Sequence, residues 1–417
     1  METRTLVVVV GVLAILATLV VGGLLLPESG GSLTEQWVSD TARDNERNHH
    51  PVGVGPDGDV VVASVMAVPG SDVTLTDTSC SLYRLAPENG SVRWQEGVPA
   101  ESCFTHAMTE PAIADIDGDG TLEVAVATTE NALVVYAADS GDERFRVPLE
   151  TYGYGRPTVA DLAPAPGSEM LVSDIRGNVV LAGANGTVHW RASLADTFDG
   201  RAFVRDPPQV ADIDADGDRE ILVGTGNGLA VLSTGGERLW TTDRGARDVQ
   251  VVQTDDDAAL EILSTDISDS SITALDGATR EREWTREFAQ SPRITAVGDV
   301  DDDETLELFV GLANGTALSI DATTGSVEWR TTVSTTEGAV LAPPVVGSVD
   351  GETPSVVTVG RDGTVAVLDA ASGEQRASYQ RSVPVWTVPT RADIDDDGRE
   401  EILVRYGDGR VVALAFE

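Results

Sequence analysis

Aspartate and glutamate recur in four loops at a spacing that could hold a cation. Acidic residues stand at positions 1, 3, 5 and 9 of each loop, and position 7 offers a backbone carbonyl. The loops comprise Asp115, Asp117, Asp119, Thr121 and Glu123; Asp212, Asp214, Asp216, Asp218 and Glu220; Asp299, Asp301, Asp303, Thr305 and Glu307; and Asp393, Asp395, Asp397, Arg399 and Glu401. Calcium prefers about six to eight oxygen ligands, and without a cation these carboxylates would repel one another. We therefore predict structural calcium here, and magnesium fits less well because it demands a stricter octahedron.

Position 6 of each loop controls the turn around the ion. It is glycine in three loops, and glycine adopts the positive φ that such a turn requires. The third loop carries Glu304 at this position, so we expect its turn to be strained.

Arginine and aromatic residues form a second set, in the connections between successive repeats. The candidate ligand-binding residues are Tyr152, Tyr154, Arg156, Arg201, Arg205, Arg247, Arg293 and Trp386. Arginine beside aromatic rings suits the recognition of carboxylate, sulfate or a glycan ring. The alternative is that these arginines pair with neighbouring aspartates. We expect His49 and His50 to lie in a solvated stretch before the first repeat, with transition-metal binding as the alternative.

Short strands must position both sets of residues. An aromatic residue returns about once per repeat, as at Trp94, Trp190, Trp284 and Trp329, and an acid followed by an apolar run stands between successive aromatics. Each repeat therefore holds four short strands, which predicts an all-β, eight-bladed β-propeller, or a seven-bladed one if the first repeat is irregular. The last repeat lacks one strand, and the segment around Trp37 supplies it, so this N-terminal strand should close the last blade. This topology places the four acidic loops on one face and the arginines around the channel on the other.

Two propeller repeat families resemble these motifs. The stretch from Leu318 through Gly325 to Trp329 resembles the PQQ-like repeat of quinoprotein dehydrogenases and of the bacterial outer-membrane assembly propeller. The acidic loops resemble the calcium loops of FG-GAP repeats in integrin α subunits. The resemblance covers residues 33–417. It implies a propeller with calcium, but not PQQ, because the adjacent-cysteine disulfide of the quinoproteins has no counterpart: Cys80 and Cys103 are apart in the sequence.

The composition limits the partners. The 417 residues carry a formal charge of −41, and all 28 basic residues are arginine. A surface this acidic excludes nucleic acid as a partner and disfavours anionic headgroups. It is typical of a protein from a halophile, because molar salt screens self-repulsion while carboxylates keep the surface hydrated.

The N-terminus predicts a location. Residues 5–26 are uncharged and apolar, and a helix of this length would span about 33 Å, enough for a bilayer core. With Arg4 before it, we expect residues 1–31 to form a transmembrane signal-anchor and linker, and residues 32–417 to lie outside the cell. A cleaved signal peptide is the alternative. In that oxidising location we expect a disulfide between Cys80 and Cys103, with two separate buried thiols as the alternative.

These features together favour a binding module over an enzyme. No G-x-S-x-G nucleophile motif occurs, and we predict no catalytic residues. We expect a membrane-anchored, calcium-binding propeller that recognises or scaffolds an unknown protein or glycan at the cell surface. The alternatives are a polysaccharide-active, lyase-like enzyme and a PQQ-dependent dehydrogenase.

Overall fold

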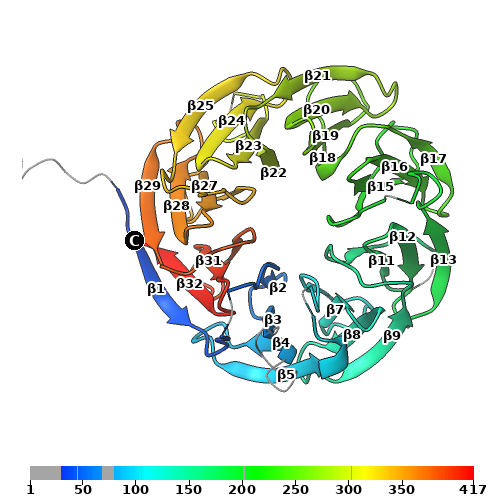
Figure 1. Cartoon of the computed structure of the whole chain (residues 1–417), viewed down its shortest axis with the longest axis horizontal. Helices are drawn as coiled ribbons and strands as arrows, with labels where there is room; N and C mark the ends of the chain where they lie inside the picture. Colours follow the sequence, from blue (N-terminus) through cyan, green and yellow to red (C-terminus); the bar gives the residue numbers. More distant parts are fainter. Residues whose placement is uncertain are drawn as a thin grey trace, which may run out of the picture.

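Eight four-stranded antiparallel sheets are arranged as blades around a common axis (Figure 1). The computed structural model describes residues 30–417, except 45, 68–78, 105, 165, 201 and 302. The eight-bladed prediction is confirmed, and the seven-bladed alternative is wrong because the first repeat forms a complete sheet.

In blades 1 to 7 the strands run outward from the axis in chain order. Blade 1 holds β2 (Gly53–Val54), β3 (Val61–Ala67), β4 (Ser79–Leu85) and β5 (Val92–Val98), followed by the 3₁₀ turn η2 (Ala100–Ser102). Blade 2 holds β6 (Ala112–Ala114), β7 (Glu123–Thr128), β8 (Ala132–Ala137) and β9 (Glu143–Pro148). Blade 3 holds β10 (Thr158–Ala160), β11 (Glu169–Ser173), β12 (Asn178–Ala182) and β13 (Val188–Ser193). Blade 4 holds β14 (Gln209–Ala211), β15 (Glu220–Thr225), β16 (Gly228–Ser233) and β17 (Arg238–Thr241).

The second half of the ring repeats this pattern. Blade 5 holds β18 (Arg247–Val252), β19 (Glu261–Asp266), β20 (Ser271–Asp276) and β21 (Arg282–Glu287). Blade 6 holds β22 (Pro292–Gly298), β23 (Glu307–Leu312), β24 (Thr316–Asp321) and β25 (Val327–Thr332). Blade 7 holds β26 (Val345–Gly347), β27 (Ser355–Val359), β28 (Thr364–Asp369) and β29 (Gln375–Gln380). Blade 8 holds β30 (Thr390–Ala392), β31 (Glu401–Arg405), β32 (Val411–Phe416) and, from the start of the chain, β1 (Leu33–Val38).

The N-terminal strand closes the ring, as predicted. β1 pairs antiparallel with β32, from Leu33 opposite Phe416 to Val38 opposite Val412. Beyond the strand ends, the backbone N–H groups of Ser32 and Glu417 donate to each other's carbonyls. Closure from both ends of the chain covers the edge that β32 would otherwise expose.

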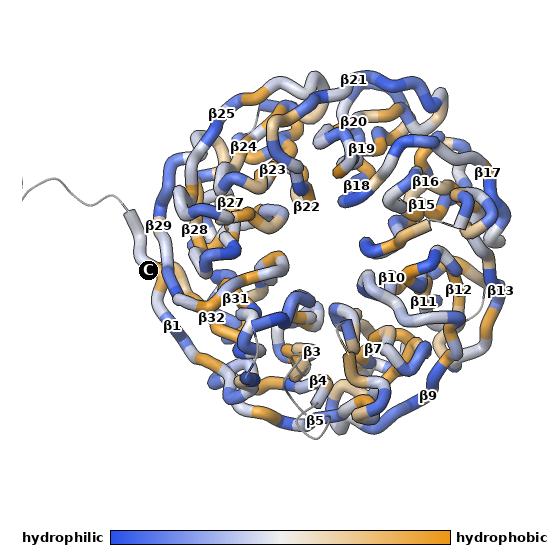
Figure 2. The backbone as a smooth tube through the Cα atoms, viewed as in Figure 1, coloured by the Kyte–Doolittle hydropathy of each residue, from blue (hydrophilic) through white to orange (hydrophobic). Residues whose placement is uncertain are grey.

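Burial follows the position of a strand in its blade. The second strands, such as β7 and β15, are buried on both faces and read as continuous apolar runs after their first glutamate. The outermost strands alternate between half-buried and exposed residues, as β13 does. Figure 2 shows the result, with hydrophilic stretches along outer strands such as β9, β17 and β21. Apolar packing between adjacent blades is therefore the core of the molecule.

In several blades a tryptophan on the outermost strand packs against the next blade and donates a hydrogen bond to it. The indole Nε1–H of Trp94 donates to the carbonyl oxygen of Ala138 in blade 2 at 2.7 Å. Its ring also lies over Gly141, where an added Cβ would approach the ring to 2.9 Å and where φ is +80°. The same arrangement joins Trp37 to Gly90, Trp190 to Gly236, Trp284 to Gly325 and Trp329 to Gly373. The recurring aromatic is thus explained by inter-blade packing.

The predicted membrane anchor at residues 5–26 lies outside the described residues. Within residues 30–417, as described, no helix is long and apolar enough to cross a membrane.

Candidate functional site

The four acidic loops connect the first and second strands of blades 2, 4, 6 and 8, at one face of the ring. The glutamate at position 9 is the first residue of the second strand and is buried in every case: Glu123, Glu220, Glu307 and Glu401. One oxygen of each accepts the backbone N–H at position 2 of its own loop: Ile116 at 2.9 Å, Ile213 at 3.1 Å, Val300 at 3.0 Å and Ile394 at 3.1 Å. Each glutamate therefore closes its loop as well as facing its interior.

The aspartate at position 1 organises the rest of the loop. Asp115 accepts backbone N–H groups from Gly118 at 2.8 Å and from Gly120 at 3.0 Å. The equivalent bonds join Gly217 to Asp212 at 3.1 Å and Gly398 to Asp393 at 2.9 Å.

The carboxylates of these loops fit a divalent cation. Carboxylate oxygens of Asp115, Asp117 and Glu123 lie within 4.8 Å of one another, as do those of Asp212, Asp214 and Asp216. Glu123 Oε1 and Asp212 Oδ1 are buried and accept no hydrogen bond from the described residues. Buried acceptors without donors are costly, and a hard cation would satisfy them. In the first loop Arg144 also reaches Asp117 at 3.2 Å, so it supplies part of the neutralising charge there.

Two of the loop glutamates have raised pKa values, which shows that their negative charge is unfavourable in these loops without a cation. Burial, reinforced by Asp393, Asp395 and Asp397, raises the pKa of Glu401 to about 7. Burial, with Glu328 as the largest neighbouring charge, also raises the pKa of Glu307 to about 7. A bound cation would replace these protons.

The third loop keeps the turn despite its glutamate. Glu304 has φ +71°, close to the values of +88° at Gly120, +95° at Gly217 and +84° at Gly398. The expected strain is thus present as a left-handed non-glycine residue.

Blades 3 and 5, which lack the full acidic pattern, keep the glutamate at position 9. Glu169 accepts the N–H groups of Leu162 at 2.8 Å and Ala163 at 2.9 Å, and Glu261 accepts that of Thr254. In blade 5 the carboxylates of Asp255, Glu261 and Glu283 also lie within 4.8 Å of one another, a group that sequence spacing did not indicate. Since the glutamate makes the same hydrogen bond in loops with an incomplete acidic pattern, closing the loop is its general role.

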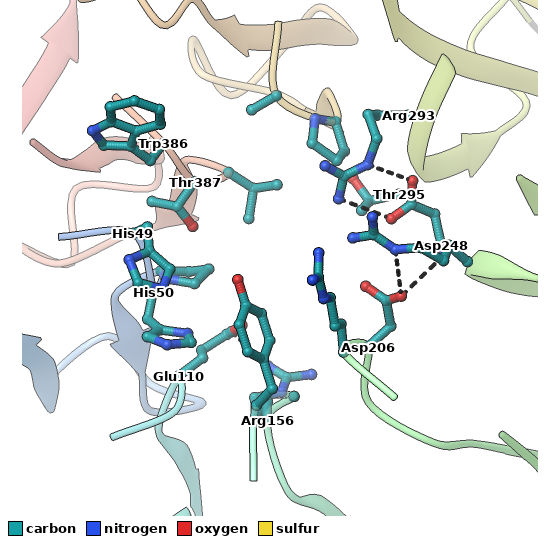
Figure 3. Close-up of a pocket in the computed structure, with 18 of the residues that line it drawn as sticks. His49, His50, Glu110, Arg156, Asp206, Asp248, Arg293, Thr295, Trp386 and Thr387 are labelled. Atoms are coloured by element: carbon teal, nitrogen blue, oxygen red, sulfur yellow. Dashed lines mark hydrogen bonds and ion pairs between the residues drawn. The ribbon is translucent and has the colours of Figure 1, made fainter. Parts of the chain in front are cut away.

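A pocket of about 320 Å³ lies on the axis at the opposite face; we call it the axial pocket (Figure 3). Its walls come from the segment before blade 1, from loops of the other blades and from the innermost strands β18 and β22. Arg247 and Arg293 therefore lie in strands, whereas the sequence placed them in the connections between repeats. The charged and aromatic residues that line it are His49, His50, Glu110, Tyr154, Arg156, Arg205, Asp206, Arg247, Asp248, Arg293, Arg361 and Trp386.

Six of the eight candidate ligand-binding residues line this pocket: Tyr154, Arg156, Arg205, Arg247, Arg293 and Trp386. Tyr152 does not line it; its ring is parallel to that of His106 at 6.5 Å and meets Phe104 edge-on. Arg201 lies outside the described residues.

Three of the pocket arginines are paired with acids from other parts of the ring. Arg293 donates to both oxygens of the buried Asp248, at 2.7 and 3.0 Å, and Figure 3 shows this pair. Arg156 lies 3.4 Å from Glu110, and Arg247 lies 3.5 Å from Asp206. The proposed pairing with acids therefore applies to these three arginines.

Two other arginines stack on aromatic rings instead. Arg205 lies over the ring of Tyr154 at 5.7 Å, and Arg361 lies over the ring of Trp386 at 3.8 Å. Neither forms a salt bridge within the part of the chain that the structure describes. Their guanidinium N–H groups are held in place and available to a ligand.

The axial pocket is positive in a strongly negative protein. Five arginines and three acids line it, a formal balance of +2 against −41 for the whole chain. Burial, followed by the charge of Asp248, raises the pKa of Asp206, and burial raises that of Glu110. The excess of arginine favours an anion in this pocket.

Sequence reasoning missed the buried groups beside this pocket. His50 is only 3% exposed, so the expectation of a solvated stretch at His49 and His50 was wrong. Arg405, at the end of β31, is fully buried, and its three guanidinium nitrogens have no hydrogen-bond partner among the described residues. No local pattern marks these residues, because their environment comes from blades far apart in the chain.

A disulfide joins Cys80 on β4 to Cys103, which follows η2. It ties blade 1 to the connection that carries His106, close to the axial pocket. These are the two cysteines that the sequence predicts to pair.

Comparisons with solved structures show the fold. The chain is similar to BamB from Moraxella catarrhalis (17% identity, TM-score 0.59, covering 92% of this chain and 98% of that one). It is also similar to the quinohemoprotein alcohol dehydrogenase ADHIIG from Pseudomonas putida HK5 (12% identity, TM-score 0.64, covering 94% and 77%). The computationally designed Ika8 protein matches at 15% identity with a TM-score of 0.60.

A comparison with curated protein sequences found no match. The sequence model of the family described as "Outer membrane protein assembly factor BamB" matches residues 162–305 and 268–417, which together are more than half of the chain. The predicted PQQ-like repeat is thereby confirmed: the chain belongs to the BamB family of PQQ-like β-propellers.

Proposed function

We propose that this protein is a calcium-stabilised, membrane-anchored propeller that recognises an anionic ligand at the cell surface. The observation that carries the proposal is the axial pocket, which is positive in a chain of net charge −41. Its volume of about 320 Å³ is at the lower end of small-ligand sites, roughly 300–1,000 Å³. A carboxylated or sulfated glycan end would pair with Arg205 and Arg361 and pack on their aromatic partners.

Calcium would have a structural role at the opposite face. Two loops gather three carboxylates each, and both contain a buried oxygen without a donor. Each of these loops joins the first and second strands of its blade, so an ion bound there would rigidify the hairpin and offset negative charge. It would not contact a ligand in the axial pocket.

The location rests on the sequence. Residues 5–26 are long and apolar enough for a single anchor, and Arg4 directs the N-terminus to the cytoplasm. The disulfide between Cys80 and Cys103 suits an oxidising exterior, and the lysine-free acidic surface suits high salt.

A polysaccharide-active enzyme is the second candidate. Tyr154, Arg205 and three histidines meet at one side of the pocket, which gives groups that could move a proton near an anionic sugar. Burial raises the pKa of Tyr154, however, which makes the phenolate that would act as the base harder to form. We do not propose a PQQ enzyme, because the cysteines of the one disulfide are not adjacent.

A glycan array with the full chain in detergent and calcium tests the proposal, followed by calorimetric titration of the best uronate or sulfate ligand. The double substitution of Arg205→Ala and Arg361→Ala should weaken binding at least about tenfold, because a charge-assisted hydrogen bond contributes roughly 1.5–3 kcal/mol. Its melting temperature should stay close to that of the wild type.

The matched control is Arg330→Ala, on the exposed outer strand β25. Equal binding by the double variant and the control, or no binding of any anionic glycan by the wild type, would contradict recognition in this pocket. Shortened or unsaturated glycan products in the incubation mixture would favour the enzyme.

A further inference from the structure

Three of the four histidines in the chain meet beside the axial pocket. His49 and His50 belong to the segment between β1 and β2, and His106 to the connection between β5 and β6. One ring nitrogen from each lies within 4.8 Å of the other two. The ring centroids of His49 and His106 are 4.3 Å apart, and the ring of Tyr154 lies 4.5 Å from that of His106.

One imidazole of the cluster is held by a backbone carbonyl, and another has a buried nitrogen without a partner among the described residues. His49 Nδ1 lies 2.7 Å from the carbonyl oxygen of Arg47, to which its N–H donates, so Nε2 keeps its lone pair and contacts His106 Nδ1. A backbone carbonyl holding the far nitrogen is the usual support of a metal-binding histidine. Nε2 of His50 is buried and has no hydrogen-bond partner among the described residues.

The backbone of His106 adopts a strained, left-handed conformation. His106 has φ +70°, an uncommon conformation for a residue with a Cβ. Two restraints act on its connection: the disulfide at Cys103, and the N–H of Thr129 bonded to the carbonyl oxygen of Ala107 at 2.9 Å. Strain that is held in place in this way is typical of functional sites.

We propose that His49, His50 and His106 bind one divalent transition-metal ion of the zinc class, with an open position toward the axial pocket. Imidazole nitrogens select zinc, cobalt, nickel or copper over calcium, and three protein ligands with an open fourth position are typical of accessible zinc sites. This site is separate from the oxygen-ligand loops, which lie at the other face of the ring.

The charge of Arg405 favours an anion as the ligand in the open position of the metal. Its unpaired, buried charge acts on both His49 and His50, so it repels a bare dication. An anion in the open position would offset this repulsion and lie near Arg205, whose charge acts on His106. This coupling between metal and anion rests on the anion recognition proposed above.

Cobalt(II) is the probe, because its visible absorption reports nitrogen ligation directly. The full chain is stripped with chelator, reloaded with calcium and titrated with cobalt, with and without sulfate. We expect one saturable cobalt site per chain, bound more tightly with sulfate. His106→Asn should weaken cobalt binding at least about tenfold, and asparagine tolerates the positive φ at this position. His50→Ala should do the same.

His189→Ala is the matched control, since the fourth histidine lies near Glu169 at the opposite face. Arg405→Met should tighten cobalt binding in the sulfate-free arm. Absence of the cobalt spectrum in both arms, or its persistence in His106→Asn, overturns the metal site. Cobalt binding that sulfate leaves unchanged supports the metal site and contradicts only the coupling. Glycan binding by the chelated protein is a separate measurement that tests the proposed function alone.

Discussion

At the scale of single residues, the sequence predicted which side chains gather at each face but not the partner of each. Six of the candidate ligand-binding residues line the axial pocket, although Arg247 and Arg293 stand in strands and not in connections. Which arginine is paired could not be predicted, because Arg293 and Asp248 are 45 positions apart and meet only after the ring closes. The meeting of His49 with His106 could not be predicted for the same reason, since they are 57 positions apart.

Glu304 carries a cost that glycine would remove. A left-handed conformation costs a residue with a Cβ roughly 1–2 kcal/mol, part of which the greater unfolded-state entropy of glycine cancels. Glu304→Gly should therefore raise the free energy of unfolding by about 1 kcal/mol, measured by chemical denaturation in calcium.

Gly217→Ala in the second loop is the reciprocal test. No atom lies within 4 Å of the added Cβ, so its effect would be conformational alone, and we expect destabilisation. A stability unchanged by both substitutions would show that the loops are too mobile for backbone conformation to matter.

Paired and stacked arginines should respond differently to mutation. Asp248→Asn leaves the guanidinium of Arg293 without its counter-charge, and we expect a loss of about 1–3 kcal/mol in the free energy of unfolding. Arg205→Ala breaks no ion pair and should cost less than about 1 kcal/mol. A comparable loss in both variants would mean that Arg205 belongs to the framework rather than to the ligand site.

At the scale of elements, the repeat pattern predicted the ring and its closure because both depend on short-range sequence signals. The sequence predicted four strands per repeat, a last repeat that lacks one strand, and its replacement by the segment around Trp37. The reason for the recurring tryptophan needed coordinates. The ring of Trp94 and its N–H bond to the carbonyl oxygen of Ala138 bind one blade to the next, a contact between repeats rather than within one.

Deleting residues 33–38 tests the closing strand. Without β1, the hydrogen-bonding edge of β32 is exposed, and Trp37 no longer covers Gly90 in blade 1. We expect a melting temperature lower by several degrees or more, and self-association through the open edge in size-exclusion chromatography. Glu35→Ala, an exposed substitution in the same strand, is the control. Unaltered melting of the deletion variant would show that β1 is dispensable for closure.

At the scale of the whole molecule, the two faces of the ring gather side chains of opposite charge. One face gathers carboxylates in alternate blades, and the axis of the other gathers arginines. Counterions from molar salt screen the remaining surface, but they cannot fill buried carboxylate oxygens such as those of Glu123 and Asp212. We therefore expect divalent ions in the loops, where they would stiffen the ring of a chain with a net charge of −41.

Isothermal titration of the metal-free full chain with calcium, in molar sodium chloride and detergent, tests this expectation most directly. The account predicts saturable binding of about four ions, one per acidic loop, with a rise in melting temperature. The stoichiometry should fall by one in Asp212→Asn and stay unchanged in Asp243→Asn, an exposed control. Absence of calcium uptake, or the same uptake in both variants, would contradict it.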